Sequence, residues 1–225
     1  MDESLAKSPQ VTAEQSDTEE PDTQQKIFDA ALTVFSSKGH DGARMQEIAD
    51  LAGINRALLH YYFRTKRQLY EDVFAHLFGQ YVQSFRTTMD PERPFAESLR
   101  TWIDNYIDYV RDHQDMARLV MLENLAGGTL LGQHLARAFA THGSPQQRFE
   151  EAIVKAAERG EIQPVDPKQT ILTVISSCAL FIITAPTVKV TNPMAGEDFD
   201  AFVEARKEHV FNVIYHGVQV REGRP

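Results

Sequence analysis

Two short helices separated by a glycine constrain this chain more than any other feature. The segment MQEIADLAGINRALLHYYF runs from Met45 to Phe63. Gly53 ends a first helix, 45–52, because glycine adopts the left-handed conformation at little cost. Asn55 is a good N-cap for a second helix, 55–63. A helix, a glycine-containing turn and a helix in this spacing predict a helix-turn-helix unit, whose second helix enters the major groove of DNA.

Helical geometry divides this unit into an inner and an outer face. The inward-facing residues are predicted to be Ile48, Ala49, Leu51, Leu59, Tyr62 and Phe63. The outer face of the second helix then carries Arg56, Ala57, His60 and Tyr61. An arginine donates to a guanine edge or a phosphate, and small or apolar residues such as Ala57 and Leu58 can approach a thymine methyl group. His60 and Tyr61 can reach a phosphate or a base, so this face suits DNA.

The distribution of charge supports a basic module within an acidic chain. The net charge is −9 overall. Residues 1–22 carry one Lys and seven acids, net −6, whereas residues 23–70 carry seven Lys or Arg and four acids, net +3. Residues 71–225 carry fifteen basic and twenty-one acidic side chains, net −6. Local charge, not the total, determines the field at a binding face.

The stretch 27–70 resembles the DNA-binding domain of the tetracycline-repressor family. The resemblance lies in the matching residues I27-F28-x-A30-A31-x-x-x-F35, G39, I48-A49-x-x-A52-G53-I54, L59 and Y62-F63-x-x-K66-x-x-L69-Y70. It implies a homodimer, a palindromic double-stranded DNA operator, and a C-terminal domain that binds a small molecule and alters DNA affinity. The resemblance covers 44 of the 225 residues.

Several positions depart from the family pattern. Arg44 stands where the family usually has Ser or Thr, which removes a hydroxyl cap and adds a charge beside the DNA backbone. Asn55, Ala57 and His60 replace the usual Ser, Gly and Tyr. These changes bear on which operator is bound. The predicted DNA-contacting residues are Arg44, Met45, Asn55, Arg56, Ala57, Leu58, His60, Tyr61, Tyr62 and Lys66.

Packing within the protein is the alternative explanation for several of these residues. For Tyr62 we favour packing as its main role. For His60 and Tyr61, which lie among charged residues, we favour DNA contact, and for Arg56 we favour DNA contact over a solvated surface position. Lys66 begins the next helix, whose exposed amides attract phosphate.

The remaining sequence predicts an all-α chain of about nine helices. Apolar residues recur at helical spacing from Thr23, and strand alternation is absent. Thr65, Ser144-Pro145 and Asp166-Pro167 are helix starts, and Pro186 and Asn192-Pro193 are expected to bound a loop. We expect a disordered acidic tail (1–22), a three-helix DNA-binding domain (23–70) and a larger helical domain for ligand binding and dimerisation (71–225).

Aromatic residues and methionines suggest where a ligand binds in the larger domain. Trp102, Tyr106 and Tyr109 form a stripe at i, i+4 and i+7. Such a stripe is most often core, and the alternative is the wall of a pocket between helices. The candidate pocket residues are Trp102, Tyr106, Tyr109, Met116, Met121, Phe139 and Phe181. The expected effector is a small apolar or amphipathic molecule.

The last two long helices carry more apolar surface than an exposed helix tolerates. Such a surface commonly closes a two-fold interface, and the family resemblance places the dimer bundle on the last helices. The candidate interface residues are Val174, Cys178, Phe181, Phe202, Val210, Val213 and Ile214. Cys178 is interpreted as a buried small hydrophobe.

Other classes of protein are disfavoured. The chain has none of the HExxH, GxSxG, Walker or GxGxxG motifs, and His113, His134 and His142 lack metal-ligand spacing. No enzyme activity, metal or cofactor is expected. With one cysteine, no signal peptide and no membrane-length apolar run, we expect a cytoplasmic protein. The function expected is a ligand-responsive transcriptional regulator, with a DNA-binding factor lacking a ligand, or a helical enzyme or carrier, as alternatives.

Overall fold

The computed structural model describes residues 16–220, with side chains described from Asp22 onward. This part of the chain is all-α, as predicted, and contains no strand, only an isolated bridge between Ile162 and Gln219. Its helices are α1 (Ser16–Gly42), α2 (Met45–Leu51), α3 (Arg56–Tyr62), α4 (Lys66–Phe85), α5 (Phe95–Asp112), α6 (Gln114–Leu125), α7 (Thr129–His142), α8 (Pro145–Glu158), α9 (Pro167–Ile183), α10 (Ala185–Thr191), α11 (Pro193–Glu197) and α12 (Phe199–Val218).

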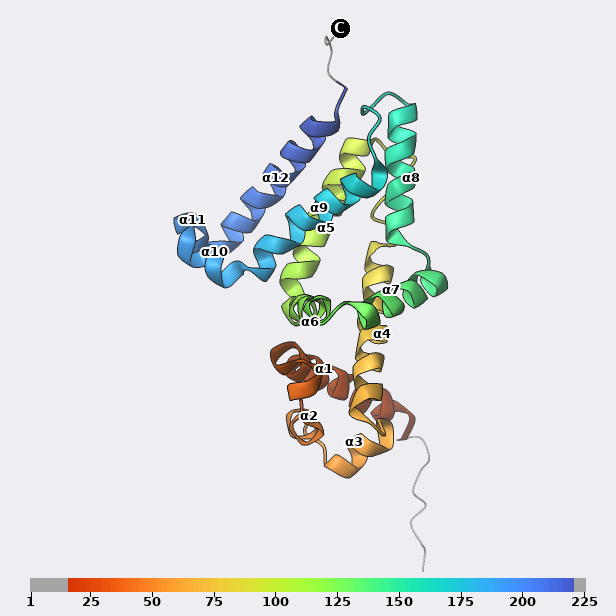
Figure 1. Ribbon diagram of the computed structural model, residues 1–225, viewed down its shortest axis with the longest axis vertical. Coiled ribbons are helices and arrows are strands. Elements are labelled where there is room, and N and C mark those ends of the chain that lie inside the picture. The colour runs from red at the N-terminus through yellow and green to blue at the C-terminus, as the bar shows by residue number, and fades with distance from the viewer. Residues whose placement is uncertain (1–15, 221–225) are drawn as a thin grey trace, which may run out of the picture.

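The helices form two bodies joined by α4. Figure 1 shows α1, α2 and α3 at one end, α6 lying across the middle, and α5, α8, α9 and α12 above it. α4 has 20 residues, about 30 Å at 1.5 Å per residue, and it continues from the first body into the second. The predicted boundary between residues 70 and 71 falls inside this helix. α1 packs on α6 and α4 packs on α7, so the two bodies also touch directly.

Buried rings and aliphatic side chains explain the path of α4. Leu69, Val73, Leu77 and Tyr81 repeat every four residues and are all buried, as the sequence pattern predicts. Thr65 caps the helix by accepting a hydrogen bond from the Gln68 amide at 3.1 Å.

The helix count differs from the sequence prediction because three helices were missed. The structure describes twelve helices along residues 16–220 rather than about nine. α7 begins after Gly128, whose φ of 69° is left-handed. α10 and α11 occupy the segment predicted as a loop, because Pro186 and Pro193 lie in their first turns, where a missing N–H costs no hydrogen bond.

Two further predictions need correction. α1 begins at Ser16, so residues 16–22 of the expected disordered tail are helical, and residues 1–15 lie outside the described part of the chain. Gly39 does break α1, with φ 67°. Leu51 is 55% exposed instead of facing inward, because it lies about 200° round the helix from Ala49 at 100° per residue.

Residues 16–220 include no single helix that is long and apolar enough to cross a membrane. α9 and α10 are long and apolar enough only when they are taken together, and the chain bends by 75° between them.

Candidate DNA-contact surface and ligand cavity

The start of α3 is fixed by a cap and by two buried side chains. The Asn55 side-chain oxygen accepts a hydrogen bond from the Leu58 amide at 2.8 Å, as predicted for an N-cap. Gly53 adopts φ 71° in the preceding turn. Leu59 and Phe63 are buried in the core. These contacts decide which side of α3 remains outward.

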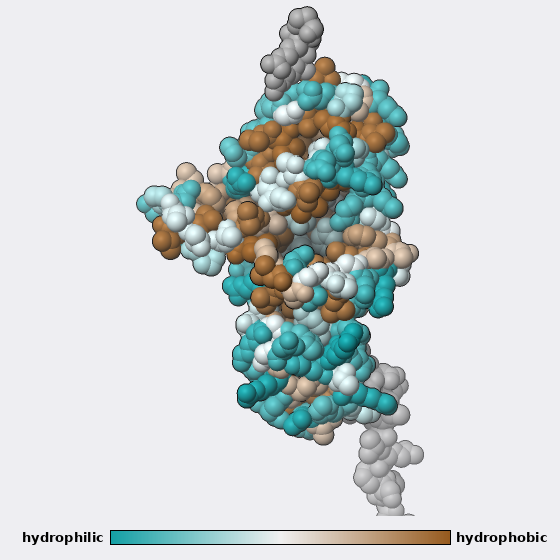
Figure 2. Space-filling view, viewed as in Figure 1, coloured by the Kyte–Doolittle hydropathy of each residue, from teal (hydrophilic) through white to brown (hydrophobic). Residues whose placement is uncertain are grey.

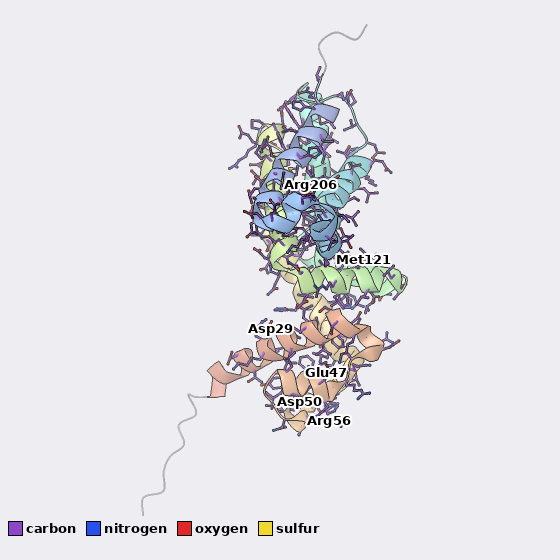
Figure 3. The ribbon with its side chains drawn as sticks, turned by 90° about the vertical axis from the view of Figure 1, so that its left-hand side faces the viewer. Asp29, Glu47, Asp50, Arg56, Met121 and Arg206 are labelled. Atoms are coloured by element: carbon purple, nitrogen blue, oxygen red, sulfur yellow. The ribbon has the colours of Figure 1, made fainter. Side chains whose placement is uncertain are left out.

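Four residues of α3, Arg56, Ala57, His60 and Tyr61, form what we call the recognition face. Arg56 and Ala57 are exposed, His60 is half-buried, and Tyr61 is 74% exposed. The Arg56 Nε–H donates to His60 Nε2 at 3.3 Å, which aligns the two side chains along the helix. Arg56 lies at the end of the molecule farthest from the larger body (Figure 3), and this end is mostly hydrophilic (Figure 2).

Most of the other residues predicted to contact DNA are less exposed or already engaged. Tyr62 is half-buried, packs on the core and meets Tyr61 edge to face at 5.5 Å, which agrees with a role in packing. Met45 and Leu58 are half-buried. Arg44 is exposed beside the start of α2, and its side chain makes no capping hydrogen bond.

Lys66 joins α4 to the turn between α1 and α2. Its ammonium group donates to the backbone carbonyls of Asp41 at 3.2 Å and Ala43 at 3.0 Å. An ammonium group has three donors, so one proton remains for a phosphate. The sequence did not predict that Lys66 binds this turn, because its partners are backbone carbonyls, which no sequence motif identifies.

The cap at Asn55 gives a stability prediction. Asn55→Ala is expected to lower the free energy of unfolding by about 1 kcal/mol, since an N-cap side chain typically contributes that much. Urea unfolding monitored by circular dichroism measures it. Asn105→Ala is the matched control, because Asn105 is exposed in the middle of α5. Equal stabilities for the two variants would show that the Asn55 cap contributes nothing.

A cavity of about 510 Å³ lies in the larger body, between α4, α5, α6, α7, α8 and α9. This volume is within the usual range for small-molecule pockets, about 300–1,000 Å³. The lining residues are Phe78, Tyr81, Tyr106, Tyr109, Val110, His113, Met116, Ala117, Val120, Met121, Asn124, Leu131, Leu135, Gln146, Ile175, Ser176, Ala179, Leu180 and Ile183. Most are apolar or aromatic, which is typical of a ligand site.

Four of the seven predicted pocket residues line this cavity, namely Tyr106, Tyr109, Met116 and Met121. Trp102 lies behind the wall, stacked on Tyr106 with ring centroids 4.6 Å apart, so the stripe is part wall and part core. Phe139 packs on the core elsewhere. Phe181 faces α12, with its ring 6.2 Å from that of Phe202.

The sequence pattern did not indicate the α4 side of this cavity, and for α7 and α9 it predicted Phe139 and Phe181 instead of the residues that line it. Phe78 and Tyr81 looked like core positions of α4, and α7, which supplies Leu131 and Leu135, was not predicted. A signal was present in Ser176, a polar residue inside the largely apolar α9, whereas Gln146 stands in the polar first turn of α8.

Most residues predicted for the dimer interface are buried within one subunit. Val174, Cys178, Phe181, Val210 and Ile214 are buried, Phe202 is half-buried, and only Val213, at 59%, is well exposed. The reason is that α9 and α12 both pack on α5, which covers their apolar stripes. Burial also raises the pKa of the Cys178 thiol to about 12, which fits its interpretation as a small hydrophobe.

Several contacts connect the cavity-bearing body to the helix-turn-helix. The Tyr70 hydroxyl in α4 donates to the Glu123 carboxylate in α6 at 3.1 Å. Burial and the Glu123 carboxylate both raise the pKa of Tyr70, so the hydroxyl keeps its proton. The ring of Tyr70 also meets that of His40, near the end of α1, with centroids 5.0 Å apart.

Among the described residues, no three His, Cys, Asp or Glu side chains gather as a metal site requires.

Comparison with known proteins matches both bodies. Residues 27–73 match the family model "Bacterial regulatory proteins, tetR family", and residues 96–214 match "Tetracyclin repressor-like, C-terminal domain". The transcriptional regulator RutR of Escherichia coli K12 is 28% identical over 195 residues, which covers 87% of this chain and 90% of RutR. The transcriptional repressor SCO4008 of Streptomyces coelicolor is 28% identical over 167 residues, 74% of this chain and 81% of that protein.

Among solved structures, the regulator FadR of Bacillus subtilis in complex with stearoyl-CoA has a similar fold. Its TM-score is 0.65 at 17% sequence identity, over 87% of this chain and 99% of FadR. At this identity the likeness concerns the fold.

Proposed function

Since this chain belongs to the tetracycline-repressor family of transcriptional regulators, we propose that it is a homodimeric repressor of a palindromic operator, released by a small apolar or amphipathic effector. The observation that carries the proposal is the combination of an outward recognition face on α3 with an apolar cavity about 510 Å³ in size in the other body. The cavity favours this function over a DNA-binding factor without a ligand. Two relatives that are described as transcriptional repressors support repression over activation.

The recognition face is proposed to enter the major groove, with Arg56 nearest the bases and Arg44, at the start of α2, beside the DNA backbone. Lys66 would add its remaining donor to a phosphate. In a two-fold dimer the two copies of α3 would contact half-sites separated by one helical turn, about 34–36 Å, or a multiple of it.

The dimer partner is proposed to cover the apolar residues that α9 and α12 leave exposed. These are Leu172, Leu180 and Val213. Apolar surface also gathers over the upper body and the α10–α11 projection in Figure 2. An exposed apolar patch of this kind marks an interaction surface, whereas Val174 and Cys178 serve the core of each subunit.

Regulation is proposed to pass through α4 and α6, which line the cavity and also touch the first body. α6 supplies Met116 and Met121 to the cavity and packs on α1. The effector would bind more tightly to the conformation in which the two copies of α3 no longer match the operator. By linkage, that difference in affinity equals the loss of DNA affinity.

Selection from a pool of random duplex DNA tests the proposed function. We expect enrichment of an inverted repeat, and light scattering of the free protein should give twice the chain mass of 25.5 kDa. Binding to the selected DNA, measured by fluorescence anisotropy at several salt concentrations, should exceed binding to a scrambled sequence by orders of magnitude. If no sequence is enriched, and if binding depends on the salt concentration but not on the DNA sequence, the chain is not a sequence-specific repressor.

A further inference from the structure

The cavity is lined by side chains without a permanent charge. Among the nineteen lining residues in the described part of the chain there is no Lys, Arg, Asp or Glu. An ion that enters such a site loses its hydration and gains no oppositely charged partner, so its burial there is unfavourable. From this lining we infer that the effector is an uncharged, ring-bearing molecule and that the cavity excludes organic anions. This inference rests on the proposed function, because it specifies the ligand of the same cavity.

Several charged residues on the surrounding helices are already held by partners. Arg111 in α5 pairs with Asp108 at 3.0 Å and with Asp112 at 3.1 Å. Arg118 in α6 lies 3.7 Å from Asp115, on the exposed side of that helix.

Two further charged residues near the cavity, in α8 and α6, also have partners. Arg148 in α8 donates to the Met89 carbonyl at 3.4 Å. The Glu123 carboxylate in α6 accepts from the Tyr70 hydroxyl. An anionic ligand would therefore have to break an existing contact to pair with Arg111, Arg118 or Arg148.

The polar groups that the cavity does offer are hydroxyls, amides and the imidazole of His113, whose Nδ1 lies 2.8 Å from the Tyr109 carbonyl oxygen. Within the described part of the chain, the Tyr81 and Tyr106 hydroxyls have no hydrogen-bond partner. The Tyr109 hydroxyl donates only to the Met116 sulfur, a weak acceptor, at 3.6 Å. Burial raises the pKa of Tyr81 and Tyr106, and raises that of Tyr109 to about 12, so the three hydroxyls keep their protons. They suit a ligand with a neutral hydroxyl, carbonyl or amine group.

The arrangement of rings favours an aromatic or polycyclic ligand over a flexible chain. Tyr109 stacks on His113 with centroids 4.1 Å apart and meets Tyr81 at 68° and 5.8 Å. Met116 and Met121 add polarisable sulfur, which makes favourable contacts with aromatic rings. Ring faces, ring edges and sulfur together give a flat ligand contacts on all sides.

An acyl-CoA ligand, such as the stearoyl-CoA bound by FadR, would bring several phosphate charges to its site. Phosphates are usually held by arginine or lysine side chains. No such side chain lines the cavity of this chain among the described residues. The chain's net charge of −9 also repels anions at long range.

Two dyes with the same ring skeleton test the inference. N-phenyl-1-naphthylamine is neutral, and 8-anilino-1-naphthalenesulfonate adds one sulfonate. Fluorescence titration of the full-length protein at pH 8 is expected to show the neutral dye binding at least about tenfold more tightly, since one desolvated charge outweighs that difference. Ala117→Trp, which fills the cavity, should abolish binding, whereas Ala136→Trp on the exposed side of α7 should not.

A charge introduced at the rim gives a second test that does not depend on a core substitution. Gln146 lines the cavity from the first turn of α8, away from the α9 and α12 residues proposed for the dimer interface, and is only half-buried, so Gln146→Lys should fold normally. It is expected to tighten sulfonate-dye binding about tenfold by supplying a partner for the anion, and to leave the neutral dye nearly unchanged. Gln147→Lys, an exposed position of α8 outside the cavity, is the matched control and should change neither.

The outcomes separate this inference from the proposed function. Equal or tighter binding of the sulfonate dye in the cavity of the wild type would overturn the uncharged class, yet leave a ligand-responsive repressor intact. Binding of neither dye, or binding that a folded Ala117→Trp variant retains, would also overturn the inference. Failure of the DNA selection would instead remove the proposed function.

Discussion

Replacing Trp102 with alanine is expected to lower the free energy of unfolding by about 3–5 kcal/mol, the usual cost of truncating a large buried aromatic residue. Trp102 is 3% exposed. Its ring stacks on Tyr106 at 4.6 Å and lies 5.1 Å from Phe149 in α8 and 6.0 Å from Phe85 in α4. The indole therefore joins three helices, and its removal leaves a void that the surrounding helices cannot fill.

Urea unfolding at a fixed protein concentration measures this effect, because the stability of the proposed dimer would depend on concentration. The melting temperature should fall by about 10 °C, at 2–4 °C per kcal/mol for a chain of this size. Trp102→Phe keeps a ring between Tyr106 and Phe149 and should retain most of the stability. A loss below about 1 kcal/mol in Trp102→Ala would show that the indole is not a core group.

The Trp102→Phe variant also distinguishes the two interpretations of the aromatic stripe, core or pocket wall. As a core residue behind the wall, Trp102 affects a ligand only through Tyr106, which loses its stacking partner. We expect the neutral dye to bind Trp102→Phe nearly as tightly as wild type. A large loss of dye binding in this folded variant would instead place Trp102 in the pocket itself.

Local signals account for what the sequence predicted well. Asn55 and Thr65 were identified as caps because a side-chain oxygen at that position satisfies an amide two or three residues on, whatever the rest of the fold does. The recognition face followed from 3.6-residue periodicity once Leu59 and Phe63 were assigned to the core. Family resemblance then supplied the function of that face.

Tertiary contacts explain what the sequence could not predict. An apolar residue such as Val174 or Ile214 has the same pattern whether it packs against α5 or against a second subunit, and the structure assigns both to the subunit core. Trp102 and Tyr106 lie one turn apart on one stripe, yet one is behind the cavity wall and the other lines it. Proline at Pro186 and Pro193 marks a helix start as readily as a loop.

Arg56→Ala is expected to weaken binding to the selected operator about 5- to 150-fold, which corresponds to 1–3 kcal/mol for a lost arginine–guanine contact. Arg56 is exposed on the recognition face, and its Nε–H bonded to His60 Nε2 leaves the outer guanidinium nitrogens available. Fluorescence anisotropy with the operator and with each single-base variant measures the loss. Folding should be unaffected, because an exposed arginine in the first turn of α3 contributes little to the core.

The pattern of loss across DNA sequences identifies which contact Arg56 makes. A base contact predicts relaxed specificity at one operator position, whereas a phosphate contact predicts uniform weakening and a salt dependence reduced by about one charge. Arg118→Ala removes the same charge from α6, far from α3, where Arg118 lies beside Asp115. If Arg56→Ala and Arg118→Ala each bind the operator and the scrambled DNA as tightly as the wild type does, Arg56 makes no DNA contact. Recognition must then rest on Ala57, His60 and Tyr61. A loss that is confined to Arg56→Ala and to one operator position would mean that α3 presents its first turn to the base edges of the groove.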